Sequence, residues 1–206
     1  MSRRSRTRNQ EPRTGTKNPE PGTQNRGFLV RAAVIVFAAV VVYANSLSAP
    51  FIFDDQVAIV DNPAIRSLSG AWSQPRNTPL AGRPVAGLTF ALNFAANEVD
   101  AAAYRATNIS ILIACALLLF GLVRRMLALS HLHARFGGAA SDLAFAVALV
   151  WVVHPLTTDA VTYITQRTES LMALCYLITL YASLRGHRGS PGTRAGSRCR
   201  YVRPGP

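Results

Sequence analysis

Four long apolar segments run through this chain, and they restrict it to a fold that lies within a membrane. They cover about residues 28–47, 108–125, 136–156 and 160–184. A helix of about 20 apolar residues, rising about 1.5 Å per residue, crosses the hydrocarbon core of a bilayer. The sequence therefore predicts an all-α integral membrane protein with about four transmembrane helices.

The distribution of charge predicts how these helices are oriented. The chain has 22 Lys and Arg against 10 Asp and Glu, and arginine is dense in 1–27, 124–135 and 185–206 but sparser in between. Loops rich in Lys and Arg stay in the cytoplasm. We therefore expect a multi-pass protein with both termini in the cytoplasm and the long loop 48–107 outside. Membrane topology accounts for this charge, and the basic ends have almost no aromatic residues for base stacking, so no nucleic-acid partner is expected.

The two ends of the chain read differently from its middle. Residues 1–27 have no apolar periodicity and predict a disordered basic cytoplasmic tail. Residues 185–206 predict a second basic tail, native or produced by a shifted reading frame. The first apolar segment also fits a cleaved signal peptide, but its length favours an uncleaved helix. The three cysteines form no readable disulfide or metal pattern.

The loop after the first apolar segment carries the most distinctive chemistry. Its motif FIFDDQVAIVDNP places Asp54 and Asp55 side by side among apolar residues. Neighbouring side chains of an extended segment point to opposite sides, so one acid can face a reaction centre while the other holds the loop. Further on, PVAGLTFALNFAA predicts an amphipathic helix over 84–96, lying on the outer leaflet. Arg83 at its start is either a phosphate site, with the helix N–H groups, or an interfacial arginine.

A second polar segment, HPLTTDAVTYITQRTES, follows the third apolar segment. On one helix, Asp159, Thr162, Gln166 and Glu169 would form a polar stripe. Ionisable groups at membrane depth are costly, so Arg167 and Glu169 are expected either to line a functional cavity or to form an interfacial pair that anchors the helix.

These motifs, in this order, resemble a known family. FIFDDQVAIVDNPAIR, GRPVAGLTFALNF, Asn108 at the start of a span, and HPLTTDAVTYITQRTESL are similar to the TMTC-type proteins. These are transmembrane, tetratricopeptide-repeat-containing O-mannosyltransferases of the GT-C superfamily, with bacterial relatives. The resemblance covers roughly residues 28–184 and implies a GT-C-like bundle. The family's histidines near Asn108 are replaced here by Arg105 and Leu112.

The resemblance implies a transferase that moves a sugar from a polyprenyl-phosphate carrier to a protein Ser or Thr hydroxyl. Asp54 and Asp55 match the family's proposed catalytic acids, and one of them would act as general base. A divalent metal at these two acids is left open, with no further ligand spacing to support it. The lipid phosphate or substrate is expected to bind at a set of ionisable residues, namely Arg83, His154, Arg167 and Glu169.

Two other classes of function are considered, a non-catalytic membrane protein and a transporter, and the number of spans leads to a separate expectation about length. A non-catalytic scaffold or lipid-binding protein could keep the same fold, whereas a small transporter would concentrate its polar groups at the bilayer midplane. Members of the family have more spans and a repeat domain. The four spans here therefore lead us to expect an N-terminal fragment of a bacterial inner-membrane transferase, inactive by itself.

The predicted topology can be tested by cysteine labelling. A cysteine introduced at Ser69 should react with a membrane-impermeant thiol reagent added to intact cells, because Ser69 belongs to the outer loop. A cysteine at Ser130 should be protected until the membrane is opened. Equal labelling at both positions would contradict the assignment.

Overall fold

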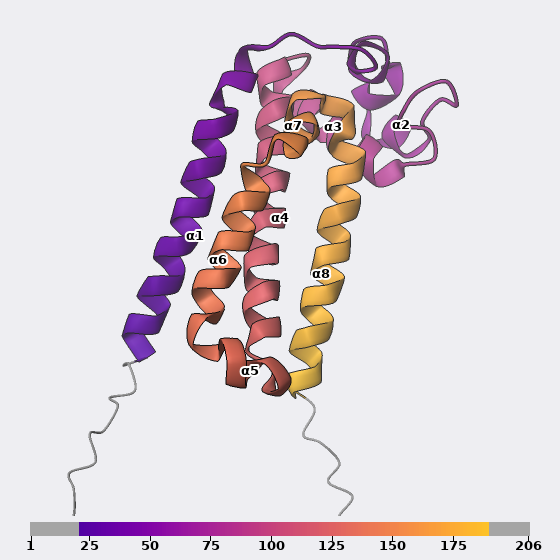
Figure 1. Cartoon of the computed structure of the whole chain (residues 1–206). Helices are drawn as coiled ribbons and strands as arrows, with labels where there is room; N and C mark the ends of the chain where they lie inside the picture. The colour runs from indigo at the N-terminus through magenta and orange to yellow at the C-terminus, as the bar shows by residue number, and fades with distance from the viewer. Residues whose placement is uncertain (1–20, 190–206) are drawn as a thin grey trace, which may run out of the picture.

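The structure, a computed structural model, describes residues 21–189, and these residues form α-helices, short 3₁₀ or π turns and loops without any strand. The predicted all-α class is confirmed. The helices are α1 Pro21–Tyr43, α2 Leu68–Trp72, α3 Pro84–Asn97, α4 Ala101–Leu127, α5 Ser130–Phe136, α6 Ala140–Val152, α7 Thr158–Thr162 and α8 Arg167–Gly189 (Figure 1).

The helices α1, α4, α6 and α8 form an elongated bundle in which successive helices run in opposite directions (Figure 1). Residues 21 and 189, where the described chain begins and ends, therefore lie at the same end of the bundle. The core between α1, α4 and α6 contains the small residues Ala39, Ala116, Ala144 and Ala148, all fully buried. Small side chains let helix backbones approach closely, which favours packing within a membrane.

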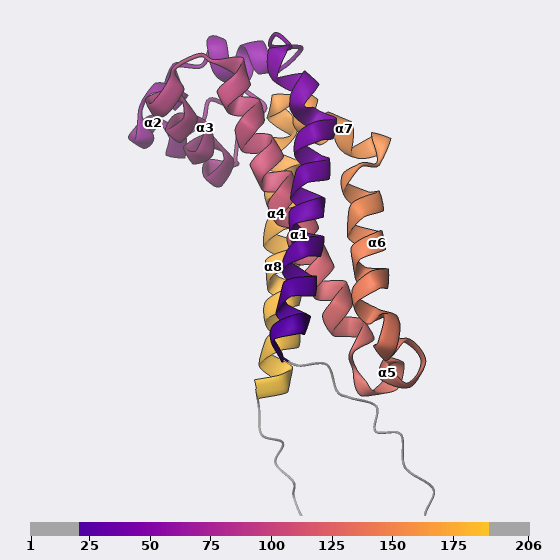
Figure 2. The same ribbon diagram turned by 90° about the vertical axis from the view of Figure 1, so that its left-hand side faces the viewer.

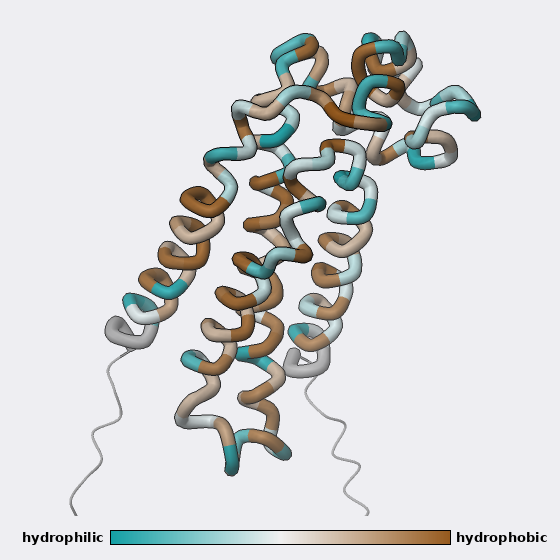
Figure 3. Tube along the Cα trace, turned by 45° about the horizontal axis from the view of Figure 1, so that its top comes forward, coloured by the Kyte–Doolittle hydropathy of each residue, from teal (hydrophilic) through white to brown (hydrophobic). Residues whose placement is uncertain are grey.

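Three stretches of the described chain are long and apolar enough to cross a membrane: Asn25–Ser48, Ala101–Leu127 and Ser130–Val152. The helix α8, predicted as the fourth span, does not meet this measure because polar residues interrupt its apolar ones (Figure 3). It nevertheless packs along α4 within the bundle. A helix that rests against its neighbours does not need to be apolar on every face.

The helix boundaries differ from the sequence predictions in several places. α4 begins at Ala101 rather than near 108, because Asp100 accepts a hydrogen bond from the Ala102 N–H at 3.0 Å and caps the helix. α1 begins at Pro21, inside the predicted tail, and α8 continues to Gly189. The rest of both predicted tails, 1–20 and 190–206, lies outside the described residues.

The predicted helix over 160–184 is interrupted, which corrects the expected polar stripe. α7 ends at Thr162, and Tyr163 has an extended backbone with φ −92° and ψ 102° before a 3₁₀ turn leads into α8. Glu169 borders a cavity between α3 and α8, whereas Asp159 and Thr162 of α7 border a different cavity. The physical cause of the break lies in the contacts of Asp55 described below.

The loop between α1 and α4 folds into a compact cap at one end of the bundle, and α2 and α3 project to one side (Figure 2). Its core is formed by buried apolar residues, among them Ile59, Ile65, Leu80, Phe90 and Tyr104. The helix predicted over 84–96 is confirmed as α3. Its placement on the outer leaflet remains a prediction.

The close approach of α2 and α3 generates a prediction at Gly87. A Cβ added there would lie 2.4 Å from the carbonyl oxygen of Ala71, which is backbone and cannot move aside cheaply. Gly87→Ala should therefore lower the free energy of unfolding by about 1–3 kcal/mol. Thermal unfolding in detergent would measure the loss. Gly138→Ala is the matched control, since nothing lies within 4 Å of its added Cβ; equal stability of the two variants would contradict the packing.

Candidate functional site

Asp55 is fully buried and connects the loop after α1 to the break before α8. Its Oδ1 accepts a hydrogen bond from the Thr165 N–H at 3.0 Å, and its Oδ2 accepts from the N–H groups of Ile164 and Ile52, both at 3.4 Å. In a continuous helix, the N–H groups of Ile164 and Thr165 would instead donate to carbonyl oxygens of the preceding turn. The helix break at Tyr163 therefore supplies the donors that Asp55 requires.

Arg105 of α4 holds the same loop from the other side. Its guanidinium is fully buried and donates to the carbonyl oxygens of Ala49 and Pro50 and, at 3.4 Å, to that of Thr162. It also lies close enough to Asp55 for their charges to interact. Arg105 thus holds the start of the loop at Ala49 and Pro50, and Asp55 holds its motif against the chain before α8.

Asp54, the other acid of the motif, is exposed and borders an open cavity. Its Oδ2 accepts a hydrogen bond from the Tyr163 hydroxyl at 2.7 Å. Phe53 beside it has φ +47°, a left-handed conformation that is strained for a bulky residue, and its ring meets Tyr163 edge-on with 6.2 Å between ring centroids. The cavity, of about 520 Å³, is lined by Ile52, Phe53, Asp54, Asp159, Thr162, Tyr163 and Gln166.

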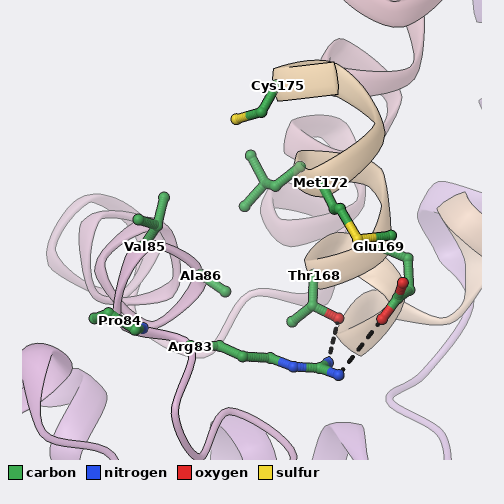
Figure 4. A pocket seen from close by; sticks show the side chains of 9 residues that line it. Arg83, Pro84, Val85, Ala86, Thr168, Glu169, Met172 and Cys175 are labelled. Carbon is green, nitrogen blue, oxygen red and sulfur yellow. Dashed lines mark hydrogen bonds and ion pairs between the residues drawn. The ribbon is translucent and has the colours of Figure 1, made fainter. Parts of the chain in front are cut away.

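Arg83 lies at the start of α3 and borders a second cavity, about 330 Å³ in volume, between α3 and α8 (Figure 4). It donates to the Thr168 hydroxyl at 2.7 Å and forms an ion pair with Glu169 at 3.5 Å. Arg83 and Glu169 are each about half exposed. Apolar side chains, including Val85 and Met172, line the rest of this cavity, so a cation faces a largely apolar surface.

Arg167 is fully buried, and protein groups occupy its donors. It donates to the side-chain oxygens of Asn108 at 2.7 Å and Asn93 at 2.6 Å, and to the carbonyl oxygen of Tyr104 at 2.8 Å. Its guanidinium also lies over the Phe90 ring, 4.3 Å from the centroid. These contacts connect α3, α4 and the start of α8.

His154 is exposed at the turn between α6 and α7. Its Nδ1 accepts a hydrogen bond from the Leu156 N–H at 3.2 Å, and its ring borders a third, mainly apolar cavity of about 600 Å³ along α6. The predicted site residues are therefore distributed over several separate cavities and the interior. The structure brings Arg83 together with Glu169, and Asp54 together with Asp159 and Gln166, but Arg83 and Asp54 line different cavities.

The two adjacent acids do not converge on one point. Asp55 accepts backbone N–H groups in the interior, whereas Asp54 faces the cavity. Across the described part of the chain, no three His, Cys, Asp or Glu side chains are grouped so that they could hold a metal ion. The side chains of the motif are thus arranged for two separate roles.

Sequence reasoning did not identify Tyr163 or Asn93. Tyr163 contacts Asp54 across 109 positions of the chain, and no local pattern marks the break that exposes it. Asn93 lies on a helix that the sequence does predict, but its partner Arg167 is 74 positions away. Only the tertiary contacts show these two roles.

The burial of Asp55 generates a prediction about pH. Burial is the largest influence on its carboxyl and raises its pKa above the ordinary 3.8, against the lowering effect of the three N–H donors and Arg105. The folded state therefore holds this proton more tightly than the unfolded chain does. Its contribution to stability is complete below about pH 4 and is lost as the pH rises through the folded pKa.

The measurement compares unfolding of the wild type and Asp55→Asn in detergent between about pH 4 and pH 7. The free energy of unfolding of the wild type, relative to the variant, should fall across this range. Asp61→Asn removes an exposed carboxylate and serves as control. A wild-type advantage that grows with pH would show that the folded pKa of Asp55 is lowered instead.

No protein-family model matches the chain, and no solved structure matches it. A protein O-mannosyl-transferase of Caenorhabditis elegans is 27% identical over 177 residues, which cover 81% of this chain and 24% of that protein. Protein O-mannosyl-transferase Tmtc3 of Drosophila melanogaster is 28% identical over 87% of this chain and 22% of its own length. Protein O-mannosyl-transferase TMTC1 of Homo sapiens is 30% identical over 71% of this chain and 17% of its own length. The chain thus spans about a quarter or less of the length of these relatives. Over most of its own length, it is similar to proteins named protein O-mannosyl-transferases, in agreement with the resemblance that its motifs carry.

Proposed function

We propose that this chain forms part of a membrane-embedded protein O-glycosyltransferase of the mannosyltransferase type, with a GT-C-like fold. The names of its relatives and its apolar helices support the class of protein. The observation that carries the proposal is Asp54, an accessible carboxylate that is held in place beside an open, partly polar cavity at one end of the bundle.

In the proposed reaction, Asp54 acts as the general base. It takes the proton from a Ser or Thr hydroxyl of the acceptor protein while the hydroxyl oxygen attacks the anomeric carbon of the donor sugar. The bond between that carbon and the phosphate oxygen breaks, and the lipid phosphate leaves with the electron pair. A hydroxyl has a pKa far above neutral and needs such a base. Asp55 does not suit this role, because it is buried and binds backbone N–H groups.

The donor in this proposal is a sugar on a polyprenyl phosphate, and Arg83 is the group that fits its phosphate best. A half-exposed guanidinium beside an apolar wall matches a charged headgroup with a hydrocarbon tail (Figure 4). An incoming phosphate has to compete with Glu169 for Arg83. Arg167 supports this region from the interior rather than binding the phosphate itself, because its donors are already occupied.

The proposal places the cap outside the cell membrane and both ends of the described chain in the cytoplasm, as in a bacterial inner-membrane protein. The arginine distribution supports this orientation. Asp54 and Asp55 are not placed to share one divalent metal ion, since Asp54 accepts from Tyr163 at the cavity and Asp55 accepts from backbone N–H groups in the interior. His154 borders a separate apolar cavity, where it can contact lipid.

A non-catalytic membrane scaffold is the second candidate. Asp55, Arg105 and Arg167 are fully buried, and protein groups satisfy them, so their presence needs no ligand to explain it. This candidate leaves Asp54 without a function and predicts that replacing it changes nothing measurable.

The two candidates are separated by Asp54→Asn. In the transferase that contains this segment, the variant should transfer sugar from polyprenyl-phosphate mannose to a Ser/Thr peptide about 10²–10⁴-fold more slowly, because the general base is lost. Its folding should be unchanged, since Asp54 is exposed. Asp61→Asn is the matched control, another exposed carboxylate of the same loop outside the cavity. Full activity of Asp54→Asn would favour the scaffold.

A further inference from the structure

Tyr163 occupies the one residue at which the chain between α7 and α8 is extended. Its hydroxyl donates to Asp54 Oδ2 at 2.7 Å, and its ring meets the exposed ring of Phe53. The next two residues, Ile164 and Thr165, donate their N–H groups to Asp55. A single three-residue segment therefore holds both acids of the motif, one through a side chain and one through the backbone.

We propose that Tyr163 is the positioning residue for Asp54 in the transfer reaction, an inference that rests on the proposed function. The hydroxyl fixes Oδ2, while Oδ1 has no hydrogen bond to the described part of the chain and can face the acceptor hydroxyl. A general base works only when its free oxygen is aimed at the proton it removes. An exposed aspartate without a partner would rotate freely about its side-chain bonds.

The contact suits this role chemically. Burial, followed by the hydrogen bond to Asp54, raises the pKa of the Tyr163 hydroxyl, so that it stays protonated and remains a donor at neutral pH. A hydrogen bond to a charged carboxylate is stronger than one between neutral groups. The edge-on contact with Phe53 also orients the phenol ring. The Tyr163 side chain is therefore held both by its ring and by its hydroxyl.

The first test examines the contact without requiring activity. The purified chain is treated with a water-soluble carbodiimide and glycine ethyl ester, and coupling at Asp54 is followed by mass spectrometry. Tyr163→Phe keeps the ring and removes only the hydroxyl that binds Oδ2. Oδ1 is free of hydrogen bonds to the described residues in both proteins, but the variant carboxylate gains a second accessible oxygen and can rotate, so coupling at Asp54 should be several-fold faster. Tyr176→Phe, at an exposed tyrosine of α8, is the matched control and should match the wild type. An unchanged rate in Tyr163→Phe would overturn the proposed contact.

The second test is a double-mutant cycle in the transferase that contains this segment, with polyprenyl-phosphate mannose and a Ser/Thr peptide. Tyr163→Phe should lower kcat roughly 10- to 100-fold with little change in KM. It should cause no further loss in an Asp54→Asn background, because there is then no base to position. Loss of activity in Asp54→Asn with full activity in Tyr163→Phe would overturn the positioning role and leave the proposed function standing. Full activity in Asp54→Asn would instead overturn the proposed function.

Discussion

The hydrogen bonds between the Asp55 carboxylate and the N–H groups of the 3₁₀ turn that leads into α8 are the interaction on which the arrangement of this molecule depends. They bring together two segments that lie more than a hundred positions apart in the chain. A buried carboxylate is costly unless N–H donors surround it, and N–H groups at a helix start are costly unless an acceptor reaches them. The N–H groups stabilise the buried carboxylate, and the carboxylate satisfies the N–H groups. These hydrogen bonds fix the cap to the bundle.

The same interaction explains why the two neighbouring acids differ. When the Asp55 side chain points inward, the Asp54 side chain is directed outward. The positive φ of Phe53 turns the chain just before these two acids. Tyr163 stands opposite Asp54 because the helix must break there to release N–H groups for Asp55. The geometry of the candidate base thus follows from a structural requirement one residue away.

Buried arginines complete this framework in a way that is easily mistaken for a binding site. Arg167 is a charged group near a membrane, which in the sequence suggests contact with a phosphate. In the structure Arg167 and Arg105 are both enclosed, and the carbonyl and amide oxygens around them replace water. Arg83, by contrast, remains half exposed and pairs with a carboxylate that a ligand can displace. Exposure and the occupation of donors distinguish the two kinds of arginine.

The sequence alone determined the all-α class of fold and the helix α3, because hydropathy and helical period are local properties of the chain. It marked Asp54 and Asp55 as candidate site residues, a role that stays a prediction. It also predicted that the two acids would differ, but not which one would be buried. It missed the break at Tyr163 and the early start of α4, and it joined Glu169 to a polar stripe that the fold divides. Those features depend on pairs such as Asp55 with Thr165 and Arg167 with Asn93. Local periodicity carries no information about such pairs, since their energies exist only after distant segments have come together.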